Sequence, residues 1–138
     1  MTQRTLLLVG ALLSASTACG PAPEACARQC GEIRELFEAP CGSQHTGTPA
    51  ECAPWVGKVS AMAKELDNSL QGKPVEPGVR EALPKLITAV SDFQSQNCGD
   101  VKVDNVASTE QRQSKCNEAL IATRGDLGSL YFTAQVPD

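Results

Sequence analysis

Aromatic residues, histidine and runs of basic residues are all scarce in this sequence. Its 138 residues include three Phe, one Trp, one Tyr and one His. With so few aromatic side chains, a buried core has to be built mainly from aliphatic residues. Lys and Arg do not cluster anywhere along the chain, although clusters of them are needed to bind phosphates. This argues against nucleic acid as a partner.

Sequence motifs of common catalytic sites are also missing. No P-loop, GxGxxG, HExxH or Gly-x-Ser-x-Gly occurs. The single histidine, His45, lies in a Gly- and Thr-containing segment that is typical of a solvated loop. Glu32, Glu35 and Glu38 recur at intervals of three, which predicts one exposed side of a helix rather than two carboxylates facing across a cleft. We therefore expect no catalytic residues and a protein that is not an enzyme.

The first 18 residues have the three parts of a signal peptide. Arg4 supplies positive charge, residues 5–13 form an uncharged apolar run, and small residues occupy positions 14–18. The apolar run is much shorter than the approximately 20 residues that span a bilayer. We predict that residues 1–18 are removed on export, by cleavage just before Cys19.

The sequence Ser16-Thr17-Ala18-Cys19 resembles the lipobox of bacterial lipoproteins. In that family a small residue precedes a cysteine whose thiol is joined to diacylglycerol. The resemblance implies that Cys19 is the lipid attachment site and that the protein is held on a cell-envelope membrane. Ser16 departs from the aliphatic residue usual at its position. An ordinary signal peptidase would cut the same bond and release a soluble, secreted protein with Cys19 unmodified.

The remaining cysteines fit an exported, disulfide-braced domain. Apart from Cys19 the chain has six, an even number, at positions 26, 30, 41, 52, 98 and 116. Residues 19–23 would be the attachment site with a short tether, and residues 24–138 one cysteine-rich domain. Loss of Arg4 leaves 11 basic and 16 acidic side chains, a formal charge of −5. This charge argues against electrostatic binding to anionic lipid, so attachment would depend on the lipid itself.

Apolar residues with helical spacing predict an all-α fold, an antiparallel bundle of about four helices braced by disulfides. The first helix is expected over residues 24–38. The second begins at the capping box of Thr48 and stops at Gly72. The third carries Val79 to Phe93, with Pro84 as a possible kink, and the fourth begins at a second capping box, Ser108 with Gln111. Residues 100–107 and 130–136 are compatible with extended structure.

This bundle also suggests which cysteines are paired. Cys30 and Cys116 would lie at similar heights, about 12 Å from one end of the bundle. We therefore expect Cys116 to bond to Cys30 or Cys26, and Cys98 to Cys41 or Cys52. Cys26 and Cys30 are not expected to bond to each other, because side chains four residues apart on a helix do not suit disulfide geometry.

Two hypotheses for function remain open. The first is a non-catalytic envelope lipoprotein that binds or scaffolds another envelope component. The second is a binder of a small ligand or of Cu(I), because the Cys26-x3-Cys30 pair resembles those of four-helix copper-storage proteins. Those proteins have many such pairs and this chain has one, so we expect disulfides, no metal site and no cofactor. A filled core with three disulfides would favour the first hypothesis, and an apolar interior pocket or reduced inward cysteines the second.

Overall fold

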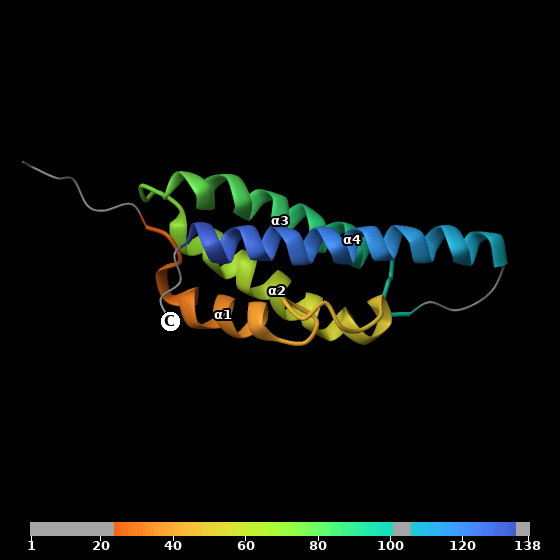
Figure 1. The fold of residues 1–138 in the computed structure, drawn as a ribbon. Helices are drawn as coiled ribbons and strands as arrows, with labels where there is room; N and C mark the ends of the chain where they lie inside the picture. The colour runs from red at the N-terminus through yellow and green to blue at the C-terminus, as the bar shows by residue number, and fades with distance from the viewer. Residues whose placement is uncertain (1–23, 101–105, 135–138) are drawn as a thin grey trace, which may run out of the picture.

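A computed structural model describes residues 24–100 and 106–134 of the chain, and these residues form a bundle of four α-helices (Figure 1). The elements are the 3-10 turn η1 (Ala27–Gln29), α1 (Cys30–Glu38), α2 (Pro49–Leu70), α3 (Pro77–Ser95) and α4 (Val106–Thr133). Three disulfides join Cys26 to Cys30, Cys41 to Cys52, and Cys98 to Cys116. The predicted all-α, disulfide-braced bundle is confirmed.

Successive helices run in opposite directions along the bundle (Figure 1). α3 and α4 lie side by side over most of the length of α3, while the shorter α1 packs against α2 and α4. The core between them is largely aliphatic, as expected, and Trp55 and Phe93 are its only buried aromatic side chains among the described residues. The first and last described residues lie at the same end of the bundle.

α2 begins and is buried as its sequence predicts. Thr48 Oγ1 accepts a hydrogen bond from Glu51 N, and Glu51 Oε2 accepts one from Thr48 N at 2.8 Å, which completes the capping box. Below this cap, the predicted stripe faces the core and is fully buried: Cys52, Val56, Val59, Ala63, Leu66 and Leu70. The helix ends at Leu70, and Gly72 follows with a left-handed φ of 71°.

α3 begins earlier than its apolar residues alone indicate. Its cap is Glu76, whose carboxylate accepts hydrogen bonds from Gly78 N and Val79 N, with Pro77 at the first helical position. Pro84 lies on the exposed side, and the helix continues through it without a break. Solvent can satisfy the carbonyl group that the missing Pro84 N–H leaves free, which explains why this proline is tolerated.

The predicted helix over residues 24–38 is wrong in its first part. Glu24 instead pairs with Val75 in an isolated parallel bridge, and Ala27 has a left-handed φ of 45°. A regular helix therefore begins only at Cys30. The expectation that Cys26 and Cys30 would not pair is wrong for the same reason, because it assumed that both lie on one regular helix. Cys26 has a non-helical backbone, so the side-chain directions of a regular helix no longer apply, and the two Cα atoms lie 5.0 Å apart.

The predicted bonds from Cys116 to the first helix and from Cys98 to Cys41 or Cys52 are also wrong. α4 does not begin at Ser108, which lies inside the helix, but at Val106, and its first turns extend past the ends of α2 and α3 (Figure 1). Because of this extension, Cys116 lies about 15 Å from the start of α4. That position is level with Cys98, which follows α3, and the two cysteines form a disulfide.

The two segments whose sequence is compatible with extended structure have different outcomes. Residues 130–133 belong to α4, which continues to Thr133, so this stretch is helical. Residues 101–105 and 135–136 lie outside the described residues, as do Cys19 and the predicted signal peptide. The buried stripe of α4 agrees with its prediction at Cys116, Leu120, Thr123, Leu127 and Leu130.

The disulfides should differ in their contribution to stability. Cys98–Cys116 closes 18 residues and Cys26–Cys30 closes four. From loop-closure entropy, replacing Cys98 and Cys116 together by Ala should lower the free energy of unfolding by about 3 kcal/mol, against about 2 kcal/mol for the Cys26 and Cys30 pair. Urea unfolding of the two double variants measures the difference. A larger loss from the Cys26 and Cys30 variant would contradict this order.

Candidate functional site

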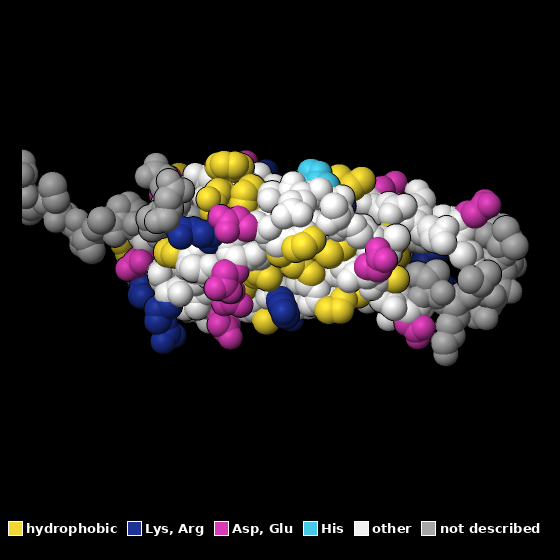
Figure 2. Space-filling view, turned by 60° about the horizontal axis from the view of Figure 1, so that its bottom comes forward, with side chains coloured by type: hydrophobic (Ala, Val, Ile, Leu, Met, Phe, Trp, Pro, Cys, Tyr) yellow, Lys and Arg dark blue, Asp and Glu magenta, His cyan; other side chains and the backbone are white. Residues whose placement is uncertain are grey.

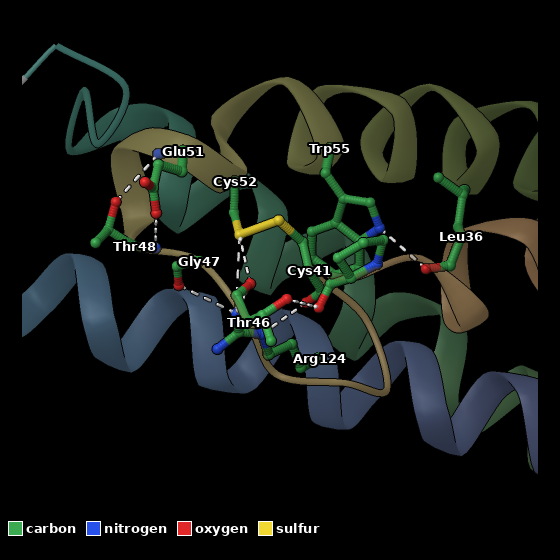
Figure 3. The surroundings of a disulfide bond; sticks show 10 residues. Leu36, Cys41, Thr46, Gly47, Thr48, Glu51, Cys52, Trp55 and Arg124 are labelled. Carbon is green, nitrogen blue, oxygen red and sulfur yellow. Dashed lines mark hydrogen bonds between the residues drawn. A yellow bond between two sulfur atoms is a disulfide. The ribbon is translucent and has the colours of Figure 1, made fainter.

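The disulfide loop, residues 39–48, joins α1 to α2 and is held at both sides (Figure 3). Cys41 in the loop is bonded to Cys52 in the first turns of α2, and Arg124 reaches the loop from α4. His45 lies exposed in this loop with a left-handed φ of 52°. The loop is therefore a compact, fixed surface feature and not a flexible connection.

Pro40 sets up the hydrogen bonding at the end of α1. The carbonyl of Leu36 would normally accept from the N–H four residues later, but that residue is Pro40 and has no N–H. The indole of Trp55 on α2 replaces it, and Trp55 Nε1 donates to Leu36 O at 3.0 Å in a buried position (Figure 3). The same bond explains how the indole N–H of a side chain only 7% exposed is satisfied.

Arg124 satisfies the carbonyl groups on the other side of the loop. Its Nε donates to Cys41 O at 2.7 Å, and its Nη2 donates to Thr46 O at 3.0 Å and to Gly47 O at 3.4 Å (Figure 3). Partial burial lowers the pKa of Arg124, yet a guanidinium remains charged at any physiological pH. A planar group with five N–H donors suits this task, since one side chain binds three backbone carbonyls.

Two glycines are required by the close packing of this loop. A Cβ on Gly42 would lie 2.4 Å from Phe37 O and 2.5 Å from Leu36 O, so no larger residue fits there. Gly47 has a φ of 96°, and its Cβ would lie 2.7 Å from Cys52 Sγ. The loop backbone is thus pressed against both the end of α1 and the disulfide.

Beside the disulfide loop, an open groove of about 520 Å³ lies between α1 and α2. Leu36 and Trp55 contribute to its apolar surface, and its charged residues are Glu32, Glu35, Glu51 and Lys58. Hydrogen bonds from the backbone and side chain of Thr48 lower the pKa of Glu51. Figure 2 shows hydrophobic side chains exposed between acidic ones on this side of the molecule. An acidic groove with an apolar surface suits a ligand that has both basic and apolar groups.

The structure brings together only part of the residues considered from sequence. Glu32 and Glu35 line the groove, and Glu38 of the same helix is exposed. Within residues 24–100 and 106–134, no group of three or more His, Cys, Asp or Glu side chains is placed to hold a metal ion. All six cysteines of the domain are in disulfides, so none of them is available as a thiolate ligand.

Sequence reasoning missed the roles of Arg124 and Trp55. Arg124 lies between the buried positions Leu120 and Leu127 at helical spacing, a signal that a charged group is placed at the edge of an apolar stripe. Trp55 lies in the first turns of α2 and follows Pro40 by 15 positions. Nothing local in the sequence indicates that its indole serves the carbonyl of Leu36.

No family model matches this sequence, and the comparisons find no significant similarity to a curated protein or to a solved structure. Three disulfides in one small domain are typical of an extracytoplasmic protein, because the cytoplasm keeps thiols reduced. Among the described residues, no helix has the length and apolar character needed to cross a membrane.

Arg124→Ala should destabilise the domain by about 2 kcal/mol, because the carbonyl of Cys41 loses its partner in a partly buried position. Arg124→Lys should recover only part of this loss, since an ammonium lacks the two separate donor nitrogens, Nε and Nη2, that reach the three carbonyls. Urea unfolding measures the change. Arg112→Ala is the matched control, because Arg112 is exposed on the same helix and should change stability by less than about 0.5 kcal/mol. Equal effects at the two positions would refute the role of Arg124.

Proposed function

We propose that this protein is an exported lipoprotein, anchored through Cys19, whose helical domain binds another component of the cell envelope without catalysing a reaction. The observation that carries the proposal is the pairing of the cysteines. All six cysteines of the described residues are bonded to one another, which leaves none of them to pair with the seventh cysteine of the sequence, Cys19. Lipid attachment explains this odd cysteine, and the lipobox-like sequence before it supports the same assignment.

The form of the domain supports binding at its surface. Buried side chains from all four helices pack together in its core, and the groove beside the disulfide loop is open to solvent. The three disulfides speak against Cu(I) bound by thiolates of these six cysteines. The groove is the surface that we assign to the partner. It lies beside the fixed loop and is lined by part of the Trp55 side chain and by the carboxylates of Glu32, Glu35 and Glu51.

The anchor is tested by intact-mass measurement on protein from the native membrane fraction. The mass should correspond to a chain that begins at Cys19 and carries acyl groups, and reduction of the three disulfides should raise it by six hydrogens. Peptide mapping should recover the pairs 26–30, 41–52 and 98–116. An unmodified Cys19 would refute the lipid anchor, and free thiols with bound copper would restore the Cu(I) alternative.

Binding at the groove is tested by site-specific photo-crosslinking in cells. A photoreactive amino acid in place of Lys58, which lines the groove, should give a crosslinked product larger than the protein alone. Lys64 is the matched control, because it is exposed on the same helix and does not line the groove. Absence of a product from position 58, or equal products from both positions, would contradict the assignment of this surface.

A further inference from the structure

Three of the five aromatic side chains of the protein form one cluster at the surface. Phe37 of α1 and Tyr131 of α4 are stacked, with ring centroids 4.2 Å apart and an interplanar angle of 10°. Phe132 meets both rings edge-on, at centroid distances of 5.5 Å and 5.2 Å. These three residues are named the aromatic cluster. Phe132 is 69% exposed, whereas Phe37 and Tyr131 are half-buried.

Exposure of one phenylalanine would need no explanation, because isolated apolar side chains are common on protein surfaces. Phe132 differs in that two further rings hold it in place. Phe37 also lies close against α4, where a Cβ on Gly128 would be 3.6 Å from its ring. The cluster thus presents a fixed apolar surface across α1 and α4. Figure 2 shows one group of hydrophobic side chains near the end of the molecule where the described chain begins, and others along its middle.

The aromatic cluster lies near the point where the described chain begins. Glu24 N donates to Pro74 O, and Glu76 N donates to Glu24 O, so the first described residue is bound to the segment before α3. Two residues after Glu76, Gly78 is packed against the side chain of Thr133. Thr133 follows Phe132 in the chain. The end of α4 and the first described residue, Glu24, therefore both lie beside the start of α3.

The length of the tether connects this location to the anchor. Cys19 precedes Glu24 by five residues, which span at most about 18 Å when fully extended. A lipid on Cys19 would therefore hold this end of the bundle at the membrane and keep the opposite end away from it. The last residues of α4 are compatible with such a position, because residues 127–134 contain no charged side chain.

From this placement we propose that the aromatic cluster contacts the lipid surface beside the anchor and fixes the orientation of the domain on the membrane. The inference rests on the proposed anchor at Cys19. Aromatic rings are favoured at the boundary between head groups and acyl chains, where part of each ring remains hydrated. The mature chain is acidic, so the contact would be apolar and would depend little on anionic lipid or on salt.

The test uses tryptophan as a probe of depth in the membrane. The variants Phe132→Trp and Ile121→Trp are compared on vesicles of phosphatidylcholine with brominated acyl chains, which quench tryptophan on contact. Ile121 is the matched control, because it is 65% exposed on the same helix and lies about 16 Å farther from the end of α4. The native Trp55 is only 7% exposed and contributes a constant background. Quenching should be at least twofold greater at position 132 than at position 121, and added salt should leave it unchanged.

Two preparations separate this inference from the proposed anchor. One is the lipidated protein from membranes, and the other is oxidised chain 19–138 whose remaining thiol, Cys19, is coupled to a maleimide phospholipid in the vesicle. Equal quenching at positions 121 and 132 in both preparations would overturn the inference. So would a concentration-dependent dimer that Phe132→Ser abolishes, since a second copy would then cover the cluster. Unmodified Cys19 in the native protein, with quenching confined to position 132 in the coupled chain, would refute the anchor and leave the lipid-binding surface in place.

Discussion

The arrangement of α1, the disulfide loop and α2 depends on the hydrogen bonds that the Arg124 guanidinium donates to the loop. The loop turns sharply after Pro40, which leaves backbone carbonyls without partners in the usual helical pattern. Arg124 binds those of Cys41, Thr46 and Gly47, while Trp55 binds that of Leu36. The Arg124 bonds tie the loop to α4, and the Trp55 bond ties the end of α1 to α2. A connection of ten residues thereby becomes part of the rigid bundle, and the groove beside it acquires a fixed wall.

Much of the fold follows from the sequence because it is encoded locally. The apolar stripes of α2 and α4 have helical spacing, and the capping box at Thr48 specifies the start of α2 through two hydrogen bonds. The aliphatic composition likewise predicts the kind of core. Each of these features depends on residues close together in the chain, so pattern and chemistry are sufficient to find them.

The features that sequence reasoning missed depend on single conformations or on distant partners. Ala27 adopts a left-handed backbone conformation, which alanine does not favour. This single conformation prevents the helix from starting before Cys30 and allows the Cys26–Cys30 bond. The extension of α4 beyond its neighbours shifts Cys116 to the level of Cys98. Arg124 donates a hydrogen bond to the carbonyl of Cys41, 83 positions earlier in the chain, and no local sequence pattern indicates a contact between residues so far apart.

The order of the disulfides has a consequence for how the protein matures. The six cysteines of the domain are bonded in consecutive pairs along the chain, with separations of 4, 11 and 18 residues. If the polypeptide is translocated with its N-terminus first, both cysteines of each pair reach the oxidising compartment before the cysteines of the next pair. Oxidation could then proceed in step with translocation, with no need for later reshuffling of bonds. Acylation of Cys19 would fit this sequence of events, because it removes a thiol that would otherwise enter the compartment ahead of Cys26.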